Sequence, residues 1–204
     1  MEHIQNYISI LQQTIDQLPT QVIADVVDVL QNAREQGNHV FIMGNGGSAS
    51  TASHFVCDLA KNTRCEDLPH FKVIGLTDNM AIFSAYANDE GYENVFSQQL
   101  VNLIQPNDVV IAISASGNSN NVINAIEEAQ KHNLTTIGFT GFDGGRLGQM
   151  VKINIHVKSN IIEHVEDIHL ILEHIIVKTI KERTRSKPKV VPTVAPLALN
   201  AFGN

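Results

Sequence analysis

The segment 40–61 holds the residue types best suited to chemistry. An apolar run at 40–43 leads into Gly44-Asn45-Gly46-Gly47-Ser48, and a helical pattern carrying His54 and Asp58 follows. A glycine-rich loop at a helix N-terminus offers backbone N–H groups to a phosphate or another anion. His54 and Asp58 are four residues apart, so they share one side of the helix and are suited to binding a metal or transferring protons.

A second loop of similar chemistry follows the apolar run at 108–114. Ser114, Ser116 and Ser119 place hydroxyl groups beside a predicted helix start near Asn120, which suits a phosphate dianion. Serines also cap helices ordinarily, so it is the presence of two such loops that favours phosphate binding. Neither loop matches the Walker A pattern or the glycine spacing of a dinucleotide fingerprint, so we prefer a compact phosphorylated metabolite to a nucleotide.

The apolar helix predicted over 163–183 carries polar residues that need a partner. Glu166 and His174 are two turns apart on one side of this helix. Such groups are costly in an apolar setting unless they are paired, ligated or hydrogen-bonded, although a solvated stripe remains the alternative. Together with His54 and Asp58 they make two histidines and two carboxylates, a donor set suited to zinc or another divalent metal.

Alternating strand and helix patterns predict the scaffold for these residues. We expect an α/β fold with a doubly wound, mostly parallel five-stranded sheet, because such alternation covers both sheet faces with helices. The segment 4–36 predicts a helical hairpin or a broken long helix whose apolar surface exceeds the needs of one sheet face. The predicted strands are 39–43, 71–76, 108–114, 134–140 and 152–157, and the helices between them are 48–63, 78–87, 92–104, 119–131 and 144–150.

Composition indicates an ordinary globular protein. The 204 residues predict one domain over 1–182, with 1–36 used in oligomerisation, followed by a basic and proline-rich tail at 183–204. A net charge of −7 argues against a nucleic-acid partner. Two cysteines and no apolar run of membrane-spanning length predict a cytoplasmic protein with no membrane association.

Several motifs in combination resemble the SIS (sugar isomerase) family, and most closely its phosphoheptose isomerases. The motifs are GNGGSAS, ASHFVCDLA, ANDEGYENVFSQQL, ISASGNSNNV, GFTGFDGG and VEDIHLILEH. The resemblance runs to about residue 182 and implies a homotetramer that binds a small phosphorylated sugar. It also implies conversion of sedoheptulose 7-phosphate to D-glycero-D-manno-heptose 7-phosphate through an ene-diol(ate), with one Zn²⁺ or another divalent metal per subunit.

The resemblance also assigns roles by position. The phosphate-binding serines fall on Ser48, Ser114, Ser116 and Ser119, and further substrate contacts fall on Asn45, Gly46, Asp89 and Glu166. The metal ligands fall on His54, Asp58, Glu166 and His174, and the acid–base pair on Asp58 and His174.

Three positions depart from the family pattern. Asp58 stands where the family has Glu, Glu166 where it has Gln, and Ala115 where it has Thr. An error of about 1 Å at a proton-transfer site can cost on the order of a hundredfold in rate, so the shorter Asp58 bears directly on activity. The alternative to an isomerase is therefore a non-catalytic SIS protein that binds phosphosugars or assists a replication initiator.

Overall fold

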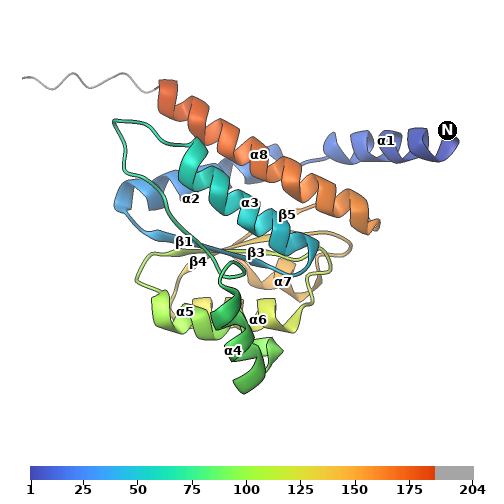
Figure 1. The fold of residues 1–204 in the computed structure, drawn as a ribbon. Coiled ribbons are helices and arrows are strands. Elements are labelled where there is room, and N and C mark those ends of the chain that lie inside the picture. The colour runs from blue at the N-terminus through green and yellow to red at the C-terminus, as the bar shows by residue number, and fades with distance from the viewer. Residues whose placement is uncertain (187–204) are drawn as a thin grey trace, which may run out of the picture.

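The computed structural model describes residues 1–186, whose centre is a sheet of five parallel strands (Figure 1). The strand order is β2-β1-β3-β4-β5, and each neighbouring pair is parallel. The strands are β1 (His39–Gly44), β2 (Lys72–Gly75), β3 (Val109–Ile113), β4 (Thr135–Thr140) and β5 (Ile153–His156). The predicted doubly wound, five-stranded α/β fold is confirmed, with every strand parallel.

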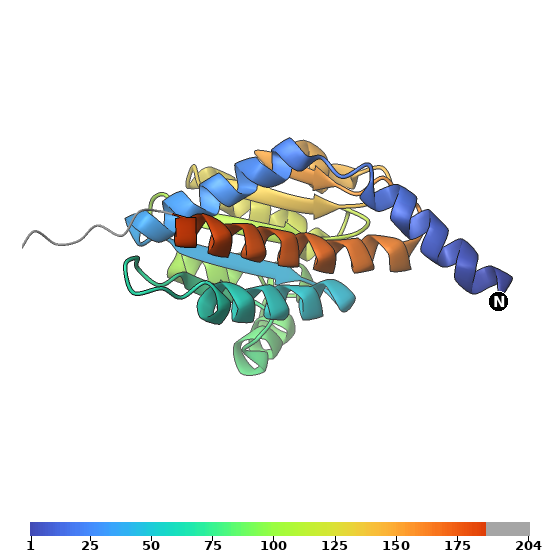
Figure 2. The same cartoon turned by 90° about the horizontal axis from the view of Figure 1, so that it is seen from above.

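Helices cover both faces of this sheet (Figures 1 and 2). On one face lie α2 (Thr20–Gln36), α3 (Gly47–Asn62) and α8 (Ile162–Ser186), and toward the other lie α4 (Met80–Asp89), α5 (Ser97–Leu103), α6 (Asn120–Lys131) and α7 (Gly145–Met150). Because successive strand residues point to opposite faces, Val40 and Ile42 join one buried core while Phe41 and Met43 join the other. Because both faces of the sheet are buried, the strand sequences are continuous apolar runs.

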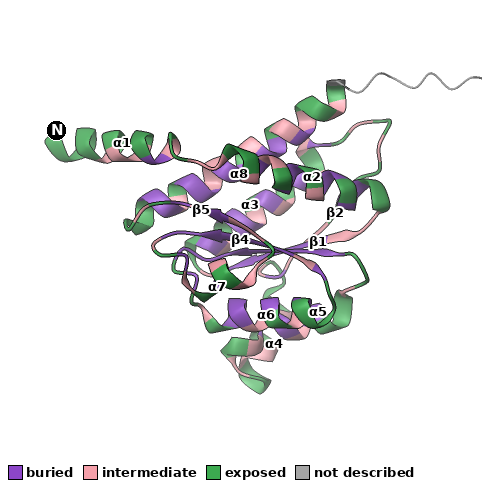
Figure 3. Cartoon of the chain, turned by 180° about the vertical axis from the view of Figure 1, so that it is seen from behind, coloured by how far each residue is buried: buried purple, intermediate pink, exposed green. Residues whose placement is uncertain are grey.

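The N-terminal helix α1 (Glu2–Ile15) projects from the body and is mostly exposed (Figures 1 and 3). It leads away from α2 after a short break at Pro19 and does not fold back along it, so the broken-helix alternative describes this segment. Tyr7 holds α1 to the start of α8, since its hydroxyl donates to Asp167 Oδ2 at 2.5 Å and its ring meets the edge of His164.

Two segments differ in detail from the sequence prediction. The helix expected over 92–104 is a short 3-10 turn, η1 (Tyr92–Asn94), followed by the separate helix α5. Ser97 Oγ donates to the Asn94 carbonyl at 3.1 Å, and such a local side-chain bond competes with a continuous helix. At the other end α8 continues through 183–186, while the rest of the predicted tail, 187–204, lies outside the described residues.

No helix within residues 1–186 combines the length and apolarity needed to cross a membrane.

Candidate functional site

The glycine-rich loop joins β1 to α3 at the carboxyl edge of the sheet. Gly46, the N-cap of α3, has a φ of 55°, a backbone conformation that favours glycine. A Cβ at Gly44 would lie 2.7 Å from the backbone of Ser48, so only glycine allows the first helical turn to pack this closely on the strand end. The sequence thus places Ser48 and the N-terminus of α3 at the carboxyl end of β1.

Asn45 connects this loop to the second one. Its side-chain amide exchanges two hydrogen bonds of 2.9 Å with that of Asn121, and Tyr92 donates to Asn45 Oδ1 at the same distance. Asn121 is buried near the N-terminus of α6, and its Oδ1 also accepts from the Val122 backbone N–H. The pair fixes the distance between the two loops. The sequence did not point to Asn121, although it stands next to the serines of the second loop.

We predict that Asn121→Ala lowers the free energy of unfolding by about 1–3 kcal/mol, because it leaves the Asn45 amide without its partner in a partly buried position. The same variant should bind a phosphosugar more weakly, since the loops lose their common anchor. Chemical denaturation and ligand titration would measure both effects. Asn102→Ala removes an exposed amide that donates only to Tyr86, and it serves as the matched control.

The serines of the second loop gather at the carboxyl end of β3. Ser114 is buried and its Oγ lies 3.5 Å from Ser119 Oγ, the N-cap residue of α6. The Ser119 side chain makes no capping bond, which leaves its hydroxyl available for another acceptor or donor. Ser116 is exposed and accepts a 3.3 Å hydrogen bond from the Asn118 backbone. Ser48 and Ser114 are thus buried at the carboxyl ends of the adjacent strands β1 and β3, whereas Ser116 is exposed to solvent.

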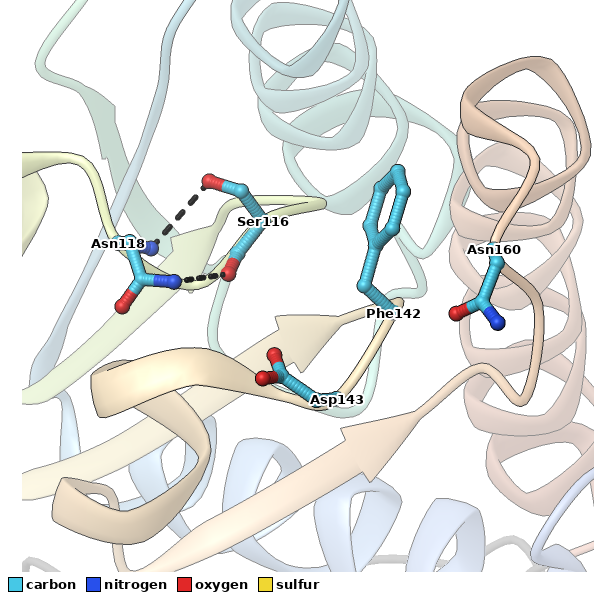
Figure 4. A pocket seen from close by; sticks show the side chains of 5 residues that line it. All are labelled: Ser116, Asn118, Phe142, Asp143 and Asn160. Atoms are coloured by element: carbon cyan, nitrogen blue, oxygen red, sulfur yellow. Dashed lines mark hydrogen bonds between the residues drawn. The ribbon is translucent and has the colours of Figure 1, made fainter.

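Two cavities flank these loops. A cavity of about 130 Å³ beside the glycine-rich loop is lined by Asn45, Gly46 and Tyr92, among others. A second cavity, of about 420 Å³, is lined by Ser116, Asn118, Phe142, Asp143 and Asn160, and in Figure 4 the Phe142 ring stands between Ser116 and Asn160. Both cavities lie at the loops that follow the strands, where open α/β sheets bind ligands.

A group of histidines and carboxylates lies between α3 and α8. The ligand atoms of His54, Asp58, Glu173 and His174 all lie within 4.8 Å of one another. His54 Nε2 is 3.4 Å from His174 Nε2 and 3.8 Å from Asp58 Oδ2. The structure therefore brings His54, Asp58 and His174 together as predicted. The fourth member of the group is Glu173 instead of the predicted Glu166.

Glu173 differs from its neighbours in being completely buried. Its side chain is 0% exposed, whereas those of His54 and His174 are 44% and 51% exposed. Burial, reinforced by the negative charge of Asp58, raises the pKa of Glu173 to about 8. The sequence holds a signal for this burial, because Glu173 stands next to Leu172 and four residues before Val177, on the side of α8 that carries its buried apolar residues.

Asp58 is held in place by its own helix. Asn62 Nδ2 donates to Asp58 Oδ1 at 2.7 Å, which leaves Oδ2 directed toward His54. The Asp58 side chain is only 14% exposed. The shorter acidic side chain noted in the sequence is therefore oriented by a neighbour one helical turn away.

Glu166 and Asp89 lie apart from this group. A Cβ at Gly47 would come within 2.5 Å of Glu166 Oε1, so the Glu166 carboxyl group lies against the first turn of α3. Asp89 is exposed at the last residue of α4, where Asn88 Nδ2 donates to it at 2.7 Å. Neither residue lines the two cavities or joins the histidine–carboxylate group described above.

Comparison with known proteins identifies the family. A model of the SIS domain matches residues 2–141, and the chain belongs to this family. It is similar to the phosphoheptose isomerase of Aquifex aeolicus, with 36% identity over 81% of this chain and 86% of that protein. A probable phosphoheptose isomerase of Thermoplasma acidophilum is 38% identical over 79% of this chain and 88% of its own length.

Solved structures agree with the sequence relatives. The structure of a phosphoheptose isomerase from Francisella tularensis has a TM-score of 0.81 at 29% identity and covers 89% of this chain and 97% of that one. The sequence-based identification of an SIS protein and of an enzyme similar to phosphoheptose isomerases is confirmed.

Proposed function

We propose that this protein is a phosphosugar aldose–ketose isomerase that converts sedoheptulose 7-phosphate to D-glycero-D-manno-heptose 7-phosphate. The observation that carries the proposal is that α3 begins at the glycine-rich loop and also carries His54 and Asp58, while the Asn45–Asn121 pair joins that loop to the serine-containing loop before α6. The similarity to phosphoheptose isomerases over most of the chain supports the same reaction class.

The phosphate fits the two loops. The N-terminus of α3, the N-terminus of α6 and the hydroxyls of Ser48, Ser114, Ser116 and Ser119 would supply its donors. Asn45 and Gly46 would contact the sugar, and we keep Asp89 and Glu166 as proposed substrate contacts. Binding of the phosphate fixes the position of the reacting carbons without taking part in the chemistry.

Asp58 and His174 are the proposed acid–base pair. Isomerisation removes a proton from the carbon beside the carbonyl and returns it to the neighbouring carbon, while a second proton moves between the two oxygens. His174 is half-exposed, Asp58 is oriented by Asn62, and the two side chains lie together between α3 and α8. Proton transfer through these two groups conserves all the atoms of the sugar.

The histidine–carboxylate group fits a divalent metal. Two imidazoles and two carboxylates suit Zn²⁺, and the buried carboxyl of Glu173 has no other hydrogen-bond donor among the described residues. When bound, such an ion would supply Lewis acidity toward the carbonyl and hydroxyl oxygens of the sugar. We propose zinc, held by residues of this group, as the cofactor.

An NMR time course in D₂O with sedoheptulose 7-phosphate and added zinc tests the proposal. We expect a new anomeric signal from the aldose product and deuterium at the adjacent carbon, because the abstracted proton exchanges with solvent. Binding of the sugar phosphate without exchange or product would instead indicate the non-catalytic alternative. A phosphatase-treated sugar is the control for the phosphate requirement.

We predict that Ser114→Ala raises KM about tenfold and changes kcat little. The variant removes one hydrogen bond to a charged phosphate, worth roughly 1.5 kcal/mol, at a site that does not react. Steady-state kinetics would separate the two constants. Ser84→Ala removes an exposed hydroxyl that donates only to the Ala81 carbonyl of its own helix and is the matched control. A fall in kcat with unchanged KM would contradict the assignment of Ser114.

We also propose that the protein is a homotetramer. The projecting helix α1 exposes Ile4 and Ile8 by 61% and 49%, and these residues line an apolar hollow with His3 and Tyr7. Apolar surface of this kind on an otherwise polar helix is typical of an interface. Light scattering after size exclusion would give the mass, and Ile4→Glu with Ile8→Glu should lower it.

A further inference from the structure

We infer that Glu173, and not Glu166, is the second carboxylate ligand of the metal. This assignment rests on the metal-assisted function proposed above and changes the ligand set that the family resemblance implies. The ion would be held by His54, Asp58, Glu173 and His174, so the position equivalent to the family's neutral Gln ligand would have left the metal centre.

The distances favour Glu173. Its Oε2 lies 3.3 Å from His174 Nε2, and His174 Nε2 lies 3.4 Å from His54 Nε2. Ligand atoms at roughly 2.0–2.1 Å from a tetrahedral zinc are about 3.3–3.4 Å from each other, so these atoms already stand at ligand spacing. Asp58 Oδ2 lies 3.8 Å from His54 Nε2, within a small side-chain adjustment of the same spacing.

The burial of Glu173 supplies an independent observation. Both carboxyl oxygens are buried, and apart from the approach of His174 Nε2 to Oε2 neither has a hydrogen-bond partner among residues 1–186. Leaving a carboxyl group buried and unpartnered costs free energy, and ligation of a cation removes that cost. Its neighbours Leu172 and Ile176 belong to the core beneath α8, so Glu173 lies on the packed side of this helix.

Glu166 is placed for a different task. It lies seven residues before Glu173, about 10 Å along the helix axis, and its carboxyl group lies against Gly47 at the start of α3. This is the end of α3 that would receive the phosphosugar, whereas His54 and Asp58 lie two to three turns further along. Glu166 therefore fits a substrate contact better than a ligand of the same ion.

The assignment also explains how Asp58 and His174 can be both metal ligands and the acid–base pair. Catalytic zinc sites usually have three protein ligands and one open position. With Glu173 in the set, three protein ligands remain when either Asp58 or His174 turns toward the substrate. The acid–base pair and the metal centre can then share residues without release of the ion.

Metal binding by the purified, metal-free full chain tests the assignment. Competition with a chromogenic chelator would give the Zn²⁺ affinity, and the visible spectrum with Co²⁺ would report the coordination number. We expect Glu173→Leu to weaken Zn²⁺ binding about a hundredfold or more and to reduce the four-coordinate Co²⁺ absorption, with no loss of thermal stability in the metal-free protein. Glu173→Gln, which keeps the side-chain volume, should weaken binding about tenfold. Glu166→Leu, which removes the carboxylate from the position of the family's Gln ligand, is the matched control and should bind Zn²⁺ like the wild type.

The outcomes separate the assignment from the proposed function. Zinc affinity within threefold of the wild type in Glu173→Leu, or a loss confined to Glu166→Leu, would overturn the assignment even in an active isomerase. Failure of the wild-type protein to bind Zn²⁺ or Co²⁺ would overturn it as well. A protein that binds metal through Glu173 but neither isomerises nor exchanges deuterium would keep the assignment and refute the isomerase.

Discussion

Replacing His174 by Gln should lower kcat/KM for sedoheptulose 7-phosphate by roughly 10²–10⁴-fold, the contribution expected of a general acid–base group. Gln keeps a polar side chain of similar reach but cannot transfer a proton at neutral pH. Because the His174 side chain is 51% exposed, the substitution should change the free energy of unfolding by less than about 0.5 kcal/mol. Deuterium exchange into the substrate should fall in parallel with turnover.

A second histidine provides the control for this result. His132 is 52% exposed at the C-terminus of α6, on the opposite face of the sheet, where it pairs with Glu128. His132→Gln should leave both kinetic constants unchanged. Near-normal turnover in His174→Gln would remove His174 from the proposed mechanism, and an equal loss in both variants would point to a general effect of histidine replacement.

The fold was predictable because its signals are local. Each buried strand is a run of β-branched and other apolar residues that ends at glycine, serine or another turn residue, as at Gly44 and Ser114. Helix 92–104 was predicted too long because hydrophobic spacing does not reveal the junction between η1 and α5, where the Ser97 side chain bonds to the Asn94 carbonyl. Whether 4–36 forms a hairpin or a broken helix depends on how α1 leaves the body, and spacing leaves both open.

The candidate site was predictable only in part, for a geometric reason. The sequence shows that His54 and Asp58 share one side of α3, because four residues make about one helical turn. It cannot show which side of α8 meets them, because that depends on how the two helices cross. Glu166 and Glu173 are both acidic residues on α8, two turns apart, and the observed crossing brings Glu173 to His54 and Glu166 to Gly47.

The loops illustrate the same limit. Glycine and serine at strand ends predict an anion-binding edge, and the topology places both loops there because β1 and β3 are adjacent and parallel. The reciprocal amide pair between Asn45 and Asn121 joins residues 76 positions apart, and no local sequence pattern predicts it. Long-range polar contacts of this kind set the spacing between the loops.

Lowering the pH should destabilise the protein through His169, a residue of α8 whose ring packs against Phe139 of β4. Burial, opposed in part by the backbone of Thr140, lowers the pKa of His169 from 6.5 to about 4. His169 therefore becomes protonated near pH 6.5 in the unfolded chain but only near pH 4 in the folded protein. Stability from this residue is fully present above pH 6.5 and is lost as the pH falls through this range, by about 3 kcal/mol in all.

The variant His169→Leu isolates this contribution, since leucine has a similar volume and does not titrate. Urea unfolding at pH 7.5 and at pH 4 would give the free energy of unfolding of both proteins. We expect the wild type to lose about 3 kcal/mol more than His169→Leu between the two values, whatever the other groups contribute. The exposed residue His3 on α1 provides the control, and His3→Leu should follow the wild type across the same pH range. Parallel curves for the wild type and His169→Leu would show that His169 is already able to bind a proton inside the folded protein.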